Sequence, residues 1–299
     1  MKLLALYCKS YSRDVLRVNR LLESIERHNR ELLPVFVSMP RADRILFENK
    51  LGSDRCHFVE DEEIAAANPG CSQRMLEILP GGLAQQIIKS EFWRLEIATN
   101  YLCVDSDSYF IKDFGQTNFL HSDGDPYTVI HQNRDLLQMA ANRGIDKVRI
   151  GFEAEYSRFF HLFGRQGPMY AFMPSPFLWS AKVWQSLVDN YLAPRQLTIC
   201  DAITSDLPES MWYGEALLAY EAIPLRPVEP YFRVYHYDWQ YFILRRQGET
   251  EEKLQKNYLG IVHQSNWDSN LDYGAKKKNL SSQILRRIKR SGRWLQTWI

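Results

Sequence analysis

The stretch Tyr101-Leu102-Cys103-Val104-Asp105-Ser106-Asp107-Ser108-Tyr109-Phe110-Ile111 carries the strongest indication of fold in this sequence. Four apolar residues lead into two aspartates that are separated by one serine. A short continuous apolar run is typical of a strand buried on both faces, as in the parallel sheet of an α/β protein. Ligands of open α/β sheets bind beyond the carboxyl ends of the strands, and Asp105 and Asp107 stand at such an end.

Asp105 and Asp107 are candidate ligands of a divalent cation. Side chains two residues apart in an extended segment point to the same side, so we expect the two carboxylates to converge on one ligand. Hard oxygen donors suit Mg²⁺ or Mn²⁺, which is usually shared with a substrate diphosphate. The alternative is a strand end followed by two solvated turn residues, a position that aspartate favours.

The remainder of the chain alternates between predicted strands and helices. Helical spacing of apolar residues or helix-start signals predict helices over residues 15–25, 40–47, 85–95, 135–163, 181–191 and 211–220. Apolar runs predict strands over residues 2–7, 33–38, 57–59 and 127–130. This alternation of strands and helices predicts an α/β fold with a doubly wound sheet. Residues 167–179 are apolar and interrupted by prolines, and we expect them to be irregular.

Composition limits the class of protein. The chain has 299 residues, of which 45% are apolar and 13% aromatic, ample for a sizeable core. No apolar run approaches the ~20 residues of a membrane span, and residues 1–7 are too short for a signal peptide. The five cysteines are scattered, which favours a reducing cytoplasm over a disulfide framework.

The C-terminal segment differs in charge from everything before it. From Lys276 onward there are eight basic residues and no acidic one, which leaves 29 basic and 36 acidic residues elsewhere, a net charge of −7. Apolar residues recur among these charges, at Ile284, Leu285, Ile288, Trp294, Leu295, Trp298 and Ile299. We expect a domain over residues 1–270 and a basic amphipathic tail over residues 271–299. The tail would bind an anionic membrane surface on the cytoplasmic side.

Two alternatives for the tail remain open. It would otherwise be a helix packed on the acidic body, or a segment that binds a partner. Nucleic acid is not expected as a partner, because the body is acidic and no recognition motif is evident.

Several features, taken in order, resemble those of GT-A-fold glycosyltransferases. They are Lys9-Ser10-Tyr11 after the first strand, Gln85-Gln86-x-x-Lys89, Asp105-Ser106-Asp107, the segment from Trp212 to Glu215, and the late His263. More narrowly, the chain is similar to a group of little-characterised bacterial proteins of that fold, associated with surface-polysaccharide synthesis. The resemblance covers about residues 1–270 and implies a GT-A-like, Rossmann-like mixed sheet flanked by helices. The family's late His-x-x-Gly-x-x-Lys-Pro-Trp pattern is absent here, and only the segment from His263 to Trp267 is present.

The resemblance also implies an activity: metal-dependent transfer of a hexose from a nucleoside-diphosphate sugar, most simply a UDP-sugar, to a saccharide or lipid-linked acceptor. The implied ligands of Mn²⁺ or Mg²⁺ are Asp105, Asp107 and His263. The residues implied to bind the donor nucleotide are Lys9, Ser10, Tyr11, Gln85, Asp105 and Ser106. The implied catalytic residues are Lys89, which would approach the donor sugar or phosphate, and Glu215, which would be the general base on the acceptor hydroxyl.

Each role has a simpler alternative. Lys89 would otherwise be a solvated surface lysine, Glu215 a first-turn acid that complements a helix dipole, and His263 a core or surface histidine. Two other classes of function compete with glycosyl transfer. One is a phosphatase-like hydrolase in which Asp105 is the nucleophile, and the other is a non-enzymatic protein that binds a membrane surface through the tail.

Overall fold

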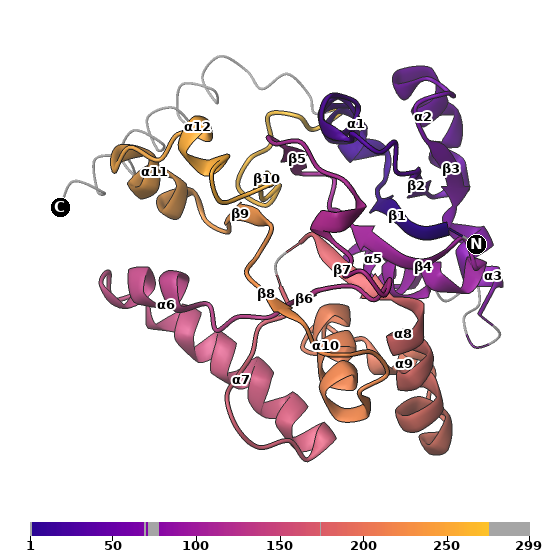
Figure 1. Ribbon diagram of the computed structural model, residues 1–299, viewed down its shortest axis with the longest axis vertical. Coiled ribbons are helices and arrows are strands. Elements are labelled where there is room, and N and C mark those ends of the chain that lie inside the picture. Colours follow the sequence, from indigo (N-terminus) through magenta and orange to yellow (C-terminus); the bar gives the residue numbers. More distant parts are fainter. Residues whose placement is uncertain (1, 69, 71–77, 174, 275–299) are drawn as a thin grey trace.

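A five-stranded sheet forms the centre of the computed structural model, which describes residues 2–68, 70, 78–173 and 175–274. Its strands run in the order β3-β2-β1-β4-β7 (Figure 1). Their bounds are β1 Lys2–Lys9, β2 Val35–Met39, β3 His57–Glu60, β4 Ala98–Cys103 and β7 Phe177–Ser180. The first four are parallel to one another, and β7 is antiparallel to β4. The predicted mixed sheet of an α/β fold is therefore confirmed.

Strand β4 is buried on both faces, as its apolar sequence predicts. Tyr101 and Cys103 pack into the hydrophobic cluster on one side of the sheet, and Leu102 and Val104 pack into the cluster on the other. All four side chains are at most 1% exposed. Removing this much apolar surface from water is the main stabilising contribution of a central strand.

Helices cover both faces of the sheet (Figure 1). One face packs against α1 (Val15–His28) and α2 (Arg44–Leu51). The other packs against a larger group, α3 (Asp61–Ala66), α5 (Gly81–Glu91), α8 (Ala181–Leu187) and α10 (Glu209–Tyr220). The remaining helices are α6 (Arg134–Ala141), α7 (Asp146–Phe163), α9 (Ile199–Ala202), α11 (Asp238–Arg246) and α12 (Glu251–Leu254). Short 3-10 or π turns occupy Ser12–Asp14, Arg41–Asp43, Phe92–Leu95, Gln116–Asn118, Val188–Leu192 and Ala193–Arg195.

A small second sheet lies directly after the two aspartates. Its strands run in the order β5-β10-β9, with β5 at Ser108–Phe110, β10 at Gly260–His263 and β9 at Phe232–Tyr235. Strand β10 is antiparallel to β5 and parallel to β9. A further pair joins β6 (Thr128–Val129) to β8 (Pro227–Val228). The β5–β10 pairing brings the late part of the chain beside the Asp105–Asp107 turn.

The structure corrects two expectations about local structure. Residues 167–179 are not wholly irregular, because the apolar residues from Phe177 onward form β7 and pair with β4. The region predicted as helical over 135–163 is divided into α6 and α7, with Gly144 between them at a φ of +66°. Glycine adopts this left-handed conformation without steric cost, so it ends the first helix and allows the second to start.

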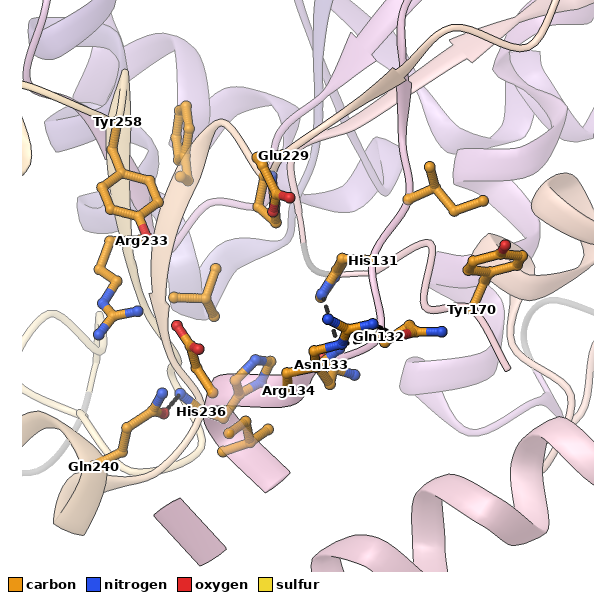
Figure 2. A pocket seen from close by; sticks show the side chains of 16 residues that line it. His131, Gln132, Asn133, Arg134, Tyr170, Glu229, Arg233, His236, Gln240 and Tyr258 are labelled. Atoms are coloured by element: carbon orange, nitrogen blue, oxygen red, sulfur yellow. Dashed lines mark hydrogen bonds between the residues drawn. The ribbon is translucent and has the colours of Figure 1, made fainter. Parts of the chain in front are cut away.

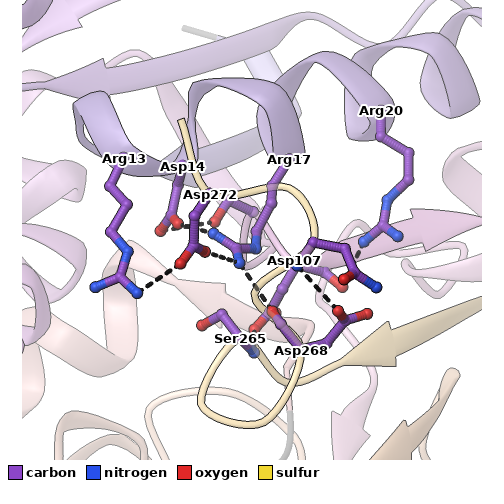
Figure 3. Close-up of polar contacts among 10 residues, drawn as sticks. Arg13, Asp14, Arg17, Arg20, Asp107, Ser265, Asp268 and Asp272 are labelled. Atoms are coloured by element: carbon purple, nitrogen blue, oxygen red, sulfur yellow. Dashed lines mark hydrogen bonds and ion pairs between the residues drawn. The ribbon is translucent and has the colours of Figure 1, made fainter. Parts of the chain in front are cut away.

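Residues 264–274 cross from β10 to the start of α1 (Figure 3). The Tyr273 backbone N–H donates to Arg13 O at 2.7 Å, and Nη2 of Arg17 donates to Asp268 O at 2.9 Å. Asp272 forms ion pairs with both arginines. The first residues of the predicted tail, 271–274, therefore lie on the body. The amphipathic segment itself, residues 275–299, falls outside the described residues. Within the described ranges, no helix has the length and hydropathy needed to cross a membrane.

Candidate functional site

The candidate site lies where the strand order of the main sheet reverses, between β1 and β4. On one side of β1 lies β2, followed by β3. On the other side of β1 lies β4. In open α/β sheets this reversal leaves a crevice beyond the carboxyl ends of the strands. The residues that follow β1 and β4 here are Ser10 and the Asp105-Ser106-Asp107 turn.

Lys89 is buried at this position and is not a surface lysine. It is 4% exposed, and its ammonium group forms an ion pair with the carboxylate of Asp105. Its Nζ also lies 4.0 Å from Oε1 of Glu209, the first residue of α10. Burial opposes the charge of Lys89, but the negative charges of Asp105 and Glu209 outweigh this and raise its pKa. Lys89 is therefore a permanently cationic group at the end of β4.

Glu209 is a site residue that the sequence did not point to. It is 5% exposed, and burial raises its pKa although the charge of Lys89 acts in the opposite direction. The signal available in the sequence is an acid directly after Pro208, which is the place where a helix begins.

Asp107 is buried beside Asp105 and is held by the second sheet. Its Oδ2 accepts a 2.7 Å hydrogen bond from the Ser265 backbone N–H (Figure 3). Its carbonyl oxygen accepts a hydrogen bond from the His263 backbone N–H at 3.1 Å. Burial and the negative charge of Asp105 raise the pKa of Asp107 to about 6, whereas the Ser265 N–H and Lys89 act to lower it. Because the charge of Asp105 raises the pKa of Asp107, the two carboxylates together form a region of concentrated negative charge.

The expected strand-like alternation of Asp105 and Asp107 is wrong. The Ser108 N–H donates to Asp105 O at 3.0 Å, so these residues form a turn rather than an extended segment. As a consequence the two carboxylates contact different elements: that of Asp105 lies against Lys89 of α5, and that of Asp107 accepts from Ser265 after β10.

The structure does not bring the His263 imidazole to the two aspartates. Its ring is surrounded by Tyr235, Tyr241 and Trp267, with centroid distances of 5.3, 5.1 and 5.6 Å. The imidazole packs in this aromatic cluster, and the backbone N–H of His263 donates to Asp107 O. Among the described residues, no group of three or more His, Cys, Asp or Glu side chains has the arrangement of a metal site. We therefore remove His263 from the expected metal ligands.

Asp105 and Asp107 alone still fit one kind of cation. Mg²⁺ is commonly held by one or two carboxylates, with substrate phosphates and water in its other positions. The carboxylate oxygens of this pair suit Mn²⁺ as well. The burial of the Asp107 side chain, together with the nearby negative charge of Asp105, is compatible with a cation at this turn.

A second group of polar side chains gathers at the ends of β1 and β3. Nζ of Lys9, which is 7% exposed, pairs with Oδ2 of Asp61 at 2.9 Å and donates to Ser10 O at 2.5 Å. The Ser10 Oγ and the Asp61 Oδ1 are buried and have no hydrogen-bond partner among the described residues. Buried polar atoms left without partners are costly, and they mark places where a ligand or water completes the bonding.

The structure supports the predicted nucleotide residues to different degrees. Lys9 and Ser10 lie together at the crevice, while the side chain of Tyr11 is 41% exposed next to them. Ser106 is turned toward α1, because its Oγ donates to Asp14 Oδ2 at 3.4 Å. Gln85 is exposed on α5, one helical turn before Lys89.

Two residues that the sequence analysis did not select are better placed than Gln85. The neighbouring Gln86 has a buried Oε1 without a partner among the described residues. Asp61, described above, comes directly after β3, and burial raises its pKa. The sequence signal for Asp61 was the acidic run from Glu60 to Glu63 after a predicted strand.

Glu215 is separated from the Lys89 cluster by the geometry of α10. It is fully buried, and Arg165 donates to both of its carboxylate oxygens, at 2.6 and 2.9 Å. Glu215 comes six residues after Glu209, which places it about 240° further around the helix. Only Glu209 faces Lys89, and Glu215 holds α10 to the segment after α7. The structure thus does not support the predicted role of Glu215 as the general base on the acceptor hydroxyl.

No protein-family model matches this chain, and a search of curated proteins finds no significant match. The arguments for a function therefore come from the residues and contacts described above.

Proposed function

We propose that this protein is a GT-A-type glycosyltransferase that moves a hexose from a nucleoside-diphosphate sugar to a saccharide or lipid-linked acceptor. A UDP-sugar is the first donor to test, and synthesis of cell-surface polysaccharide is the process to which the reaction would belong. The observation that supports this is the pair of carboxylates, Asp105 and Asp107, at the reversal of strand order, with the buried cation Lys89 beside them. The mixed sheet and its flanking helices are compatible with the proposal.

Asp105 and Asp107 would hold Mn²⁺ or Mg²⁺ together with the donor diphosphate. When bound, the cation supplies Lewis-acid stabilisation of the charge that develops on the leaving diphosphate. The raised pKa of Lys89 keeps its ammonium group charged at neutral pH, so it adds a positive charge where the same oxygens would lie. Ser10 Oγ, Asp61 Oδ1 and Gln86 Oε1, which have no partner within the described part of the chain, would hydrogen-bond to the base, the ribose or ordered water.

Glu209 replaces Glu215 in this proposal as the carboxylate of α10 beside the reacting groups. Its raised pKa and its position at the buried ammonium of Lys89 are the properties that a group exchanging a proton with an acceptor hydroxyl requires. Glu215 already has both carboxylate oxygens occupied by Arg165.

The test is calorimetric titration of the full chain with UDP and GDP, with and without Mn²⁺, for wild type, Asp107→Asn and Asp113→Asn. Asp113 is the matched control, an aspartate with a side chain 51% exposed that pairs with His28 and Arg30 away from the turn. We expect metal-dependent binding of one nucleotide by wild type and Asp113→Asn, and its loss in Asp107→Asn with an unchanged circular dichroism spectrum. Equal binding by the two variants would reject the proposed donor site.

The competing hydrolase is tested on the same proteins. Release of phosphate from p-nitrophenyl phosphate, abolished in Asp105→Asn and retained in Asp107→Asn, would favour the phosphatase-like reading. We expect no such hydrolysis.

Membrane binding through the basic segment is a separate proposal. Eight basic residues follow position 275 and none of the residues there is acidic, a composition suited to anionic lipid. Sedimentation of the full chain with phosphatidylcholine vesicles, with and without phosphatidylglycerol, measures this. We expect binding only to the anionic vesicles and its loss when Arg286, Arg287, Lys289 and Arg290 are replaced by glutamine. Equal sedimentation of wild type and variant would contradict it.

A further inference from the structure

The structure also contains a cavity whose lining includes none of the residues of the Lys89–Asp105 cluster. It is a cavity of about 450 Å³ between the segment that leads into α6 and the segment from β8 through β9 to α11. In Figure 2, Tyr258, Arg233 and Gln240 enter from one side, His131 and Tyr170 from the other, and Glu229 lies between them. The volume falls within the range of about 300–1,000 Å³ that is usual for small-molecule sites.

The cavity contains polar groups that have no partner in the protein. Within the described part of the chain, the Glu229 carboxylate and the His236 imidazole make no hydrogen bond or ion pair. The two arginines of the lining are already engaged: Arg233 pairs with Glu249 at 3.1 Å, and Arg134 donates to Gln132 Oε1 at 2.9 Å. The Glu229 carboxylate and the His236 imidazole therefore offer free hydrogen-bonding capacity to a ligand.

Both histidines of the cavity are uncharged at neutral pH. Burial, together with His131 and Arg233, lowers the pKa of His236 to about 4. Burial also lowers the pKa of His131, and its two ring nitrogens are occupied, since Nδ1 accepts from the Asn133 N–H at 3.2 Å and Nε2 donates to Met173 O. His131 is thus a fixed part of the wall, whereas neutral His236 offers one donor and one acceptor to a ligand.

These charges select among ligands. Glu229 and Asp135 are acids without ion pairs among the described residues. Of the two lining arginines, Arg233 is balanced by Glu249, whereas Arg134 donates to the neutral amide of Gln132 and keeps its positive charge. Two carboxylates therefore face one unbalanced arginine, and an anionic ligand such as a nucleoside diphosphate would meet a net negative charge here. An uncharged ligand with several hydroxyl groups can donate to Glu229 and both donate to and accept from His236, while the rings of Tyr170 and Tyr258 supply apolar faces.

The wall of the cavity continues to the Asp105–Asp107 turn. Ala171 and His131 exchange two backbone hydrogen bonds, of 3.1 and 2.7 Å, and the Met173 carbonyl holds the His131 ring. Two residues further on, Ser175 Oγ accepts a 3.0 Å hydrogen bond from the Asp105 backbone N–H. The segment that forms one side of the cavity thus also fixes the position of Asp105.

We propose that this cavity binds an uncharged saccharide, and that this saccharide is the acceptor of the transfer. The acceptor role rests on the function proposed above, whereas saccharide binding by the cavity does not. Glu229 and His236 would be its binding residues, and Tyr170 and Tyr258 would pack against the sugar ring.

The test is saturation-transfer NMR on the full chain, with methyl glycosides of glucose, galactose, mannose and N-acetylglucosamine as neutral probes and methyl glucuronide as the anionic probe. The variants are Glu229→Gln and His236→Gln. Their matched controls are Glu63→Gln and His161→Gln, at exposed residues of α3 and α7 outside the cavity lining. Thermal unfolding of each variant confirms that it is folded.

We expect at least one neutral glycoside to receive saturation from wild type, from both controls and from Asp107→Asn. Its Kd should rise about tenfold in Glu229→Gln and His236→Gln, because each substitution weakens a hydrogen bond to the sugar. Absence of transfer to every neutral glycoside, transfer to the glucuronide alone, or an unchanged Kd in both cavity variants would overturn the inference.

The two proposals fail separately. Metal-dependent UDP or GDP binding that depends on Asp107, without saccharide binding, would reject the cavity and leave the donor site standing. Saccharide binding that depends on Glu229, without nucleotide binding, would support the cavity as a saccharide site and reject the transfer reaction.

Discussion

The buried ammonium of Lys89 forms an ion pair with the carboxylate of Asp105, sixteen positions later in the sequence. The pair joins α5 to the end of β4, and Glu209 adds a second carboxylate from α10. Three elements are therefore connected through one cation at the place where we propose that the donor diphosphate binds. This arrangement makes Lys89 a structural residue as well as a candidate catalytic one.

Replacing Lys89 by methionine should destabilise the protein strongly. It would leave Asp105 and the buried Glu209 without their counter-charge, and removing one partner of a buried pair costs about 3–5 kcal/mol. We expect the lower end of this range, because the Asp105 side chain is 32% exposed. Urea denaturation measures the free energy of unfolding. Lys182→Met is the control, since Lys182 is 54% exposed and its surface pair with Asp125 should contribute at most about 1 kcal/mol. Equal stability of the two variants would disprove the role of Lys89.

Arg165→Met should cost about 3–5 kcal/mol as well, because Glu215 is fully buried and loses both of its hydrogen bonds. The double variant Arg165→Met/Glu215→Leu should regain most of this stability, since it leaves no buried charge. If Glu215 only holds α10 in place, metal-dependent nucleotide binding and turnover should recover together with stability. A stable double variant that binds nucleotide but has lost turnover would restore Glu215 as a general base.

Two helical glycines should respond to alanine in opposite directions. A Cβ at Gly214 in α10 would lie 2.1 Å from Cγ of the buried Phe172 ring, whereas a Cβ at Gly151 in α7 meets nothing within 4 Å. Gly214→Ala should therefore destabilise by about 1–3 kcal/mol through overpacking. Gly151→Ala should stabilise by about 0.5–1 kcal/mol through helix propensity. Thermal or urea unfolding checks both, and stabilisation by Gly214→Ala would show that Phe172 does not pack on α10.

The contribution of His236 to stability should fall when the pH is lowered from neutral toward 4, whereas the raised pKa of Asp107 acts in the opposite direction over the same range. The pKa of His236 is about 4 in the folded protein and returns to its ordinary value near 6.5 on unfolding. Between these values the unfolded chain binds a proton that the folded chain does not, so stability present above pH 6.5 is lost as the pH falls. The limiting slope for one such group is about 1.4 kcal/mol per pH unit.

His236→Gln should reduce this slope, and His161→Gln should not. Urea denaturation at a series of pH values measures the slope. His131 and Arg233 face His236 and also disfavour its charge, so His131, whose own pKa is lowered by burial, should account for part of the remaining dependence. A pH dependence identical in wild type and His236→Gln would contradict the assignment.

The sequence by itself determined the fold class and the central feature of the site. Apolar runs of the right length identified β1 and β4, and β4 was recognised as buried on both faces because its residues are continuously apolar. Helical periodicity identified α1, α5 and α10 to within a few residues. The two aspartates were found because polar residues that follow such a strand stand where ligands bind. All of these features are local, so each can be read within a window of a few residues.

Tertiary structure alone decided which side chains meet. Glu209 rather than Glu215 faces Lys89 because of the rotation of α10, and Asp61 meets Lys9 because β3 and β1 end on the same edge of the sheet. The backbone N–H of His263 donates to Asp107 O, while its ring packs among aromatic residues that are distant in sequence. The physical reason is that ion pairs and packing depend on contacts between segments many residues apart. Sequence periodicity specifies the face of each segment but not the partner that it meets.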